Sequence, residues 1–355
     1  MINDKNLSQE GGEKSTNFQG QNITIHNGLS YSDVKEIFLD LFKENFIQLK
    51  NEAAEIAQKR ATEITDKFLT VLNGKNPELI EAFKDPALQD ALFTTQKEFA
   101  KSGDNDLGDL LVDILIERAQ TPARNMLQLV LNESLKIVPS LTISQLDVIT
   151  LNFILLRTVN LDLENFHQLS QLIQENIEPF TENLFSDIGQ YNYLEFQRCG
   201  SIKTPPHSNL MKGWLKKWIR NYQGLFSKGI EREVILQQIN DFDQFEHLFV
   251  PCLHNNELLQ VGFLNEFDLN EALNDLKVTF DVEDKIKRFF RDFTMTTNEV
   301  KDLLVKTNPC MLKLFDILDK SAFKNFELSS VGIAIAHANF RRRTGKTLDL
   351  SLWIN

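Results

Sequence analysis

Apolar residues recur every three or four positions near the start of the chain and predict one amphipathic helix over about residues 31–72. Its apolar stripe runs through Phe38, Phe42, Phe46, Leu49, Ala53, Ala57, Ala61, Ile64, Phe68 and Leu72. The steps approximate a repeat of about 11 residues, which favours straight or slightly right-handed packing. Such a helix would be roughly 60 Å long. Its stripe can pair within the chain or with a second copy, and the sequence leaves both open.

Similar periodicity predicts shorter helices along the rest of the chain. They lie at about 77–83, 86–102, 107–138 with a break near Pro122, 141–158, 165–184, 210–226, 231–249, 269–276, 283–293, 297–307, 311–320 and 331–343. Alternating apolar and polar residues predict short strands at 191–197 and 348–354. The expected fold class is therefore mainly α, with a long N-terminal helix, a helical bundle and small β elements.

The end of the chain, residues 311–354, follows the order helix, turn, helix, strand. This order is compatible with a C-terminal winged-helix-like module. An ordinary pair of helices closed by an edge strand gives the same pattern, so both interpretations stand.

Residues 15–30 mix β-prone and polar side chains, including several Asn and Gln. Asn and Gln ladders stabilise strands stacked in register, and a lone strand pair cannot bury a face in water. We therefore predict that this segment joins copies of the chain, aided by the start of the long helix. The predicted oligomerisation residues are Phe18, Gln19, Ile23, Ile25, Phe38, Phe42 and Phe46. A simple edge hairpin or a sticky tail would also fit the pattern.

The length of 355 residues allows two or three domains. We predict a disordered tail (1–14), a β-prone assembly motif (15–30), a long helix and helical domain (31–138), a mixed helical middle domain (139–260) and a C-terminal domain (261–355). No apolar run reaches the roughly 20 residues of a membrane helix, and no secretory signal is recognisable. Three widely separated cysteines fit reduced thiols in a cytoplasm.

The net charge of −12 argues against a general nucleic-acid coat, because affinity for phosphate comes from Lys and Arg. Two stretches nevertheless lack Asp and Glu. The first, residues 198–230, carries Arg198, Lys203, Lys212, Lys216, Lys217, Arg220 and Lys228. The second carries Arg341, Arg342, Arg343 and Lys346.

Two of these basic groups are candidate nucleic-acid contacts. Trp214 and Trp218 would share one helical face beside Lys216, Lys217 and Arg220, a combination that suits base stacking and phosphate binding. It would also suit an anionic membrane surface, or a buried Trp pair with a solvated basic back. The triplet Arg341, Arg342 and Arg343 could contact phosphate, or could simply follow the preference for cations at a helix C-terminus.

Catalytic and metal-binding patterns are weak. His247, Cys252 and His254 lie close together, but zinc would need a fourth ligand and paired spacing. The common phosphate-loop, dinucleotide, zinc-protease and nucleophile-elbow motifs do not occur. We therefore predict no cofactor, no metal and no catalytic residues.

Three stretches resemble an uncharacterised family of bacterial proteins. They are Ser15-Thr16-Asn17-Phe18-Gln19 with residues 23–25 and 28–33, then residues 328–336, and residues 350–354. The resemblance implies a cytoplasmic bacterial protein, and the N-terminal segment is similar to those of some bacterial immunity and signalling proteins.

We therefore expect a non-enzymatic, homo-oligomeric assembly or sensor component of a bacterial defence or stress system, such as anti-phage defence. The main alternative is a nucleic-acid-binding regulator that uses the basic Trp segment and the winged-helix-like unit. An effector enzyme with an unfamiliar active site is a third hypothesis.

Overall fold

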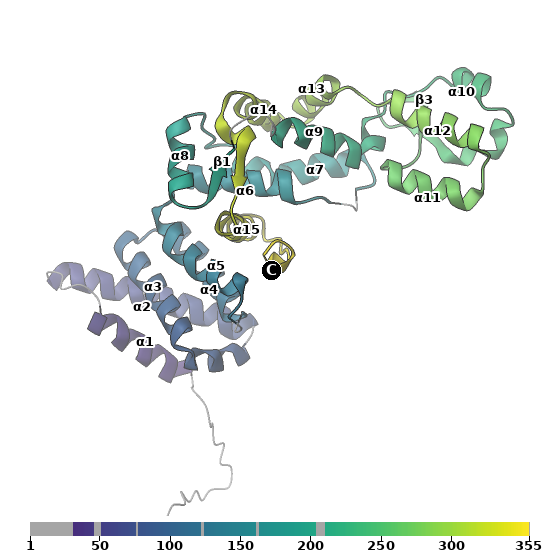
Figure 1. The fold of residues 1–355 in the computed structure, drawn as a ribbon. Helices are drawn as coiled ribbons and strands as arrows, with labels where there is room; N and C mark the ends of the chain where they lie inside the picture. The colour runs from purple at the N-terminus through teal and green to yellow at the C-terminus, as the bar shows by residue number, and fades with distance from the viewer. Residues whose placement is uncertain are drawn as a thin grey trace, which may run out of the picture. The chain divides into compact units, whose positions relative to one another are not determined.

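A computed structural model of the protein describes residues 31–45, 51–75, 77–121, 124–160, 163–203 and 210–354. The fold is mainly helical, with two small antiparallel sheets in the described part of the chain (Figure 1). Contacts divide the chain into two units, Met1–Gly103 and Asp104–Asn355, here called unit 1 and unit 2. Within the ranges given, no helix is both long enough and apolar enough to cross a membrane.

Unit 1 contains three α-helices and one 3-10 helix in its described residues: α1 (Tyr31–Asn45), α2 (Asn51–Lys75), η1 (Pro77–Lys84) and α3 (Pro86–Ser102). The three α-helices pack against one another (Figure 1). Asp85 caps α3 by accepting the Ala87 N–H, and Gly103 ends it in the left-handed conformation. The predicted helix over residues 86–102 is therefore confirmed.

The single long helix predicted over residues 31–72 is not what unit 1 contains. The ring of Phe83 lies 5.1 Å from that of Phe38 in α1 and 5.5 Å from that of Phe68 in α2. One continuous helix would separate Phe38 and Phe68 by roughly 45 Å. The apolar stripe is instead divided between two helices that pack on each other, because this lets both halves bury their rings in one core.

Unit 2 holds the remaining described elements. Its α-helices are α4 (Asn105–Ala119), α5 (Met126–Ile137), α6 (Ile143–Arg157), α7 (Phe166–Asn176), α8 (Ile188–Phe196), α9 (Leu210–Asn221), α10 (Arg232–Gln238), α11 (Glu266–Leu276), α12 (Phe280–Asp292), α13 (Thr297–Thr307), α14 (Cys310–Lys320) and α15 (Ser330–Thr344). Its strands are β1 (Gly200–Ile202), β2 (Phe249–Cys252), β3 (Asn255–Val261) and β4 (Phe326–Leu328).

The centre of unit 2 is the pair α6 and α15, which pack together and against neighbouring helices (Figure 1). Residues 145–155 of α6 and 332–340 of α15 are all buried. A helix that is buried on every side must be apolar nearly all round, and polar side chains survive there only with partners. Asn339 of α15 meets this condition by donating to the Thr150 hydroxyl of α6 at 2.9 Å.

The two sheets join segments at very different separations along the chain. β1 pairs with β4 so that Gly200 lies opposite Leu328, whereas β2 and β3 form a local hairpin. The hairpin packs with α10, α11 and α12 around a second cluster of apolar residues in unit 2. Of the helix predicted over residues 231–249, only Arg232–Gln238 are α-helical; the 3-10 helices η5 (Phe242–Gln244) and η6 (Glu246–Leu248) follow, and β2 begins at Phe249.

Both predicted strands at 191–197 and 348–354 are wrong. Residues 188–196 form α8, because Asp187 caps its first turn and Tyr191 and Leu194, three apart, both point into the core. Near the end of the chain, Asp349 accepts the Ser351 N–H at 3.0 Å and starts the 3-10 helix η8 (Leu350–Leu352). This local side-chain bond competes with an extended conformation.

The predicted winged-helix-like module needs a closing strand at residues 348–354, and the structure has the 3-10 helix η8 there instead. In the described residues, the strand next to α15 is β4, which precedes that helix and pairs with the distant β1. The C-terminal segment is therefore a helical pair integrated into unit 2 rather than a separate wing.

Candidate functional site

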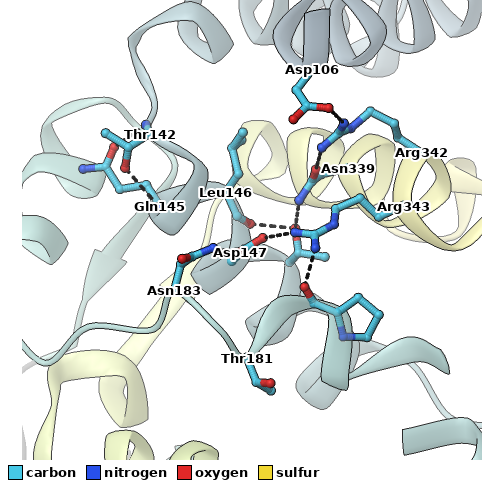
Figure 2. Close-up of polar contacts among 12 residues, drawn as sticks. Asp106, Thr142, Gln145, Leu146, Asp147, Thr181, Asn183, Asn339, Arg342 and Arg343 are labelled. Atoms are coloured by element: carbon cyan, nitrogen blue, oxygen red, sulfur yellow. Dashed lines mark hydrogen bonds and ion pairs between the residues drawn. The ribbon is translucent and has the colours of Figure 1, made fainter. Parts of the chain in front are cut away.

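The three consecutive arginines at the end of α15 form the centre of a polar cluster in unit 2. Arg342 and Arg343 extend from α15 toward Asp106 and Asp147 (Figure 2). Arg341 Nη1 donates to Glu117 Oε2 at 3.0 Å, and Arg342 Nη1 donates to Asp106 Oδ1 at 2.8 Å. The helix dipole also stabilises these cations, because they lie at the C-terminal end of α15, next to its cap Gly345.

Asp147 is the most deeply buried acid in this cluster, with a side chain only 1% exposed. Its Oδ1 accepts from Arg343 Nη1 at 2.7 Å, and its Oδ2 accepts from Asn183 Nδ2 at 3.2 Å (Figure 2). Burial raises the pKa of Asp147 even though both hydrogen bonds oppose that shift. Arg343 also donates to the Pro179 carbonyl and lies over the Phe180 ring. Arg343 therefore joins α15, α6 and the 3-10 helix η3 (Glu178–Phe180) that follows α7.

His337 is a second buried titratable group, one turn before Arg341. Its Nε2 lies 2.8 Å from the Leu348 carbonyl, which can only accept, so Nε2 carries the hydrogen. Its Nδ1 has no hydrogen-bond partner and lies 3.6 Å from Glu117 Oε2. Burial lowers the pKa of His337, against the opposing effect of Glu117; Arg341 lowers it further and Asp113 raises it.

We expect this histidine to make unit 2 less stable in mild acid. A pKa lowered by folding contributes stability above pH 6.5 that is lost as the pH falls through the folded value. The melting temperature of the unmodified chain should thus fall more between neutral pH and mild acid than that of His337→Gln, measured by circular dichroism. His247→Gln, at an exposed histidine, should keep the slope of the unmodified chain. Equal slopes for all three proteins would contradict the assignment.

The predicted Trp pair lies inside unit 2. Trp214 and Trp218 are 2% and 4% exposed, and their ring centroids are 5.3 Å apart. Trp214 also packs near Phe315, and Trp218 packs edge-on against Tyr222. Both indoles are packed against rings of their own unit, so this structure has the core pair that the sequence had left as an alternative.

The basic stretch 198–230 divides into two groups. Arg198, Lys203 and Lys228 form ion pairs, with Glu133, Glu327 and Glu299 respectively. Lys216, Lys217 and Arg220 of α9 make no ion pair with any carboxylate of the described ranges. Among the described side chains of this stretch, the cations without an internal counterion therefore all lie on α9.

A pocket of about 580 Å³ lies beside this helix. It is lined by Val159, Lys217, Arg220, Asn221, Asn265, Glu266, Phe267 and Asp268, and we call it the α9–α11 pocket. Phe267, at the first turn of α11, is 68% exposed. The structure thus places an exposed aromatic ring beside two cations, although the ring is not one of the predicted tryptophans.

A second pocket in unit 2, of about 610 Å³, is lined largely by apolar residues of α6, α7, α9 and the end of α15. The one lysine in its lining, Lys346, pairs with Glu175 at 2.6 Å and donates to the Asn176 side chain at 2.8 Å. The cation of this pocket is therefore neutralised by an acid of its own unit, whereas Lys217 and Arg220 of the α9–α11 pocket are not.

The cysteine and histidine group of residues 247–254 does not converge on one point. Cys252 is buried in the hairpin and lies 3.7 Å from the Ser227 carbonyl, while His254 Nε2 bonds the Leu225 carbonyl. No set of three possible metal ligands occurs among the residues that the structure describes. Burial raises the pKa of the Cys199 thiol to about 12, which holds it in the unreactive protonated form.

The predicted oligomerisation residues fall in two groups. Phe18, Gln19, Ile23, Ile25 and Phe46 lie outside the described residues, as do the predicted tail and assembly motif. Phe38 and Phe42 are 1% and 2% exposed and pack inside unit 1. These two rings stabilise the fold of one chain and are not a surface for another.

Sequence reasoning missed Asp147 and Phe267. An aspartate amid the apolar residues of 146–155 is a signal that could have indicated a buried ion pair. Phe267 carried no such signal, since nothing local distinguishes an exposed phenylalanine from a core one.

The fold and the site together define a mainly helical, two-unit protein with an ion-paired cluster and, in its described residues, a pocket where an exposed ring lies with two cations and two acids. A family model described as uncharacterised-like matches residues 28–354, and the chain belongs to this family. The matched range leaves out residues 15–27. No curated protein and no solved structure matches the chain.

Proposed function

We propose that the chain is a homo-oligomeric assembly component, acting in the cytoplasm within a bacterial defence or stress response. The observation that carries this proposal is that the apolar side chains of α1 are buried within unit 1. Val34, Phe38 and Phe42 all turn into the core of unit 1, so residues 15–30 are attached directly to a folded helical unit. A strand-prone segment in that position needs copies of itself, or another surface, to bury a face.

The proposed interface therefore no longer includes Phe38 and Phe42, which the sequence analysis had assigned to it. The rings of α1 and the apolar side chains of α2 stabilise unit 1, as the burial of Ala57, Ala61 and Phe68 illustrates. Association between copies then depends on residues 15–30 and not on the helical stripe.

Deleting residues 1–28 is expected to reduce the solution mass to that of one chain, as measured by multi-angle light scattering. Unit 1 should remain folded, because α1 begins after the deletion, at Tyr31. Deleting residues 1–14 alone is the matched control and should leave the mass of the assembly intact. A monomeric unmodified chain, or an unchanged mass after the longer deletion, would rule the interface out.

The alternative hypothesis, a nucleic-acid-binding regulator, has less support after the fold is taken into account. The indoles of Trp214 and Trp218 are buried, and the arginine triplet binds carboxylates of its own unit. Among the predicted nucleic-acid contacts in the described residues, Lys216, Lys217 and Arg220 are the ones that pair with no carboxylate.

A further inference from the structure

The exposed ring of Phe267 is the first of two features that point to a ligand. A phenylalanine that is 68% exposed lacks the favourable free energy that burial of its ring would provide. Phe267 shares the pocket lining with Val159, which is also exposed. A flat apolar group could cover both side chains.

The second feature is the charge beside that ring. Lys217 and Arg220 are three residues apart on α9, a spacing that places side chains on one helical face. Two acids line the same pocket, but each has another partner. Glu266 pairs with Arg291 at 3.7 Å, and Asp268 accepts from Asn265 Nδ2 at 2.8 Å.

The volume of about 580 Å³ suits a ligand of small-molecule size. The cation of the neighbouring 610 Å³ pocket, Lys346, already has an internal counterion. The α9–α11 pocket thus combines, within unit 2, an exposed aromatic ring with cations that pair with no described carboxylate.

We propose that the α9–α11 pocket binds a nucleobase and the phosphate attached to it, with the base against Phe267 and the phosphate at Lys217 and Arg220. Stacking on an aromatic face combined with a cation at the phosphate is the general chemistry of base recognition without sequence preference. A free nucleotide and a single-stranded nucleic acid both present this pair of groups. The role goes beyond assembly and does not depend on it.

The full-length chain is to be titrated at low salt with dTMP by calorimetry and with fluorescein-labelled oligothymidylate by anisotropy. We expect binding of at least one probe, and Phe267→Ala should weaken it about tenfold. The double change Lys217→Gln with Arg220→Gln should weaken it and flatten its dependence on salt. Binding of dTMP identifies a nucleotide site, whereas binding of the oligonucleotide alone identifies a single-strand site.

Two control variants sharpen this test. Phe280→Ala removes a ring that is 84% exposed at the start of α12 but does not line the pocket, and Lys216→Gln removes a cation of α9 outside the lining. Both should bind as the unmodified chain does. The proposal is overturned if neither probe binds or if Phe267→Ala binds as the unmodified chain does. It is also overturned if Phe280→Ala loses as much affinity as Phe267→Ala, or if inorganic phosphate competes for the pocket as well as dTMP does.

Discussion

Replacing Arg343 with Met is expected to lower the free energy of unfolding by about 3–5 kcal/mol, because it leaves the carboxylate of Asp147 buried without its cation. Asn183 alone would then hydrogen-bond that carboxylate. Arg343→Met also removes the bond to the Pro179 carbonyl and the packing over Phe180. Urea denaturation followed by circular dichroism measures the loss.

Charge, rather than lost packing, should account for most of this effect. Adding Asp147→Asn to Arg343→Met removes the stranded charge, so the double variant should be more stable than Arg343→Met alone. The deficit of Arg343→Met should also shrink as the pH falls, because a protonated Asp147 needs no cation and its pKa is already raised by burial.

Arg288→Met is the surface control for that experiment. Arg288 pairs with Asp284 within α12 at an exposed position, where such a pair contributes about 0.3–0.5 kcal/mol. A loss for Arg343→Met as small as that of Arg288→Met would show that the Arg343–Asp147 pair does not stabilise unit 2.

Replacing Gly332 with Ala is expected to cost about 3 kcal/mol, seen as a fall of about 10 °C in melting temperature. A Cβ at this position would lie 1.8 Å from the Cys199 carbonyl oxygen. That oxygen also accepts the Ser329 N–H at 3.1 Å, and Ser329 Oγ donates to the Arg198 carbonyl. The start of α15 is thereby held against backbone that cannot move aside as a flexible side chain could.

Gly213→Ala is the matched control, since Gly213 also lies in a helix but has open space where a Cβ would stand. There the better helix propensity of Ala should stabilise the protein by about 0.5–1 kcal/mol. Two substitutions of the same kind should therefore act in opposite directions. A neutral or stabilising Gly332→Ala would contradict the close approach of α15 to residue 199.

Most helices could be predicted because their signals lie within a few residues of each other. Thr142 and Gln145 form the capping box that starts α6, Asn165 caps α7, and Gly345 ends α15. The strands could not be predicted in the same way. β1 and β4 are stabilised by each other, and neither three-residue segment has a pattern of its own.

The candidate site was predicted only in part. Lys217 and Arg220 were recognised from the acid-free composition around them, which is a property of the sequence. Their aromatic neighbour was assigned to the wrong residues, because helical spacing shows that Trp214 and Trp218 share a face but not whether that face is buried. Phe267 comes from another helix, and only the fold brings it to α9.

The sequence by itself therefore determined the mainly helical class, the positions of most helices and the uneven distribution of charge, since all of these follow from residues near one another in the chain. The tertiary structure alone decided which charges are neutralised and which rings are exposed. Arg343 and Asp147 are 196 positions apart, and the division of the predicted long helix into α1 and α2 depends on Phe83 reaching both. A local pattern can indicate that a charge such as that of Asp147 is buried, but it cannot name a partner that lies in a distant helix.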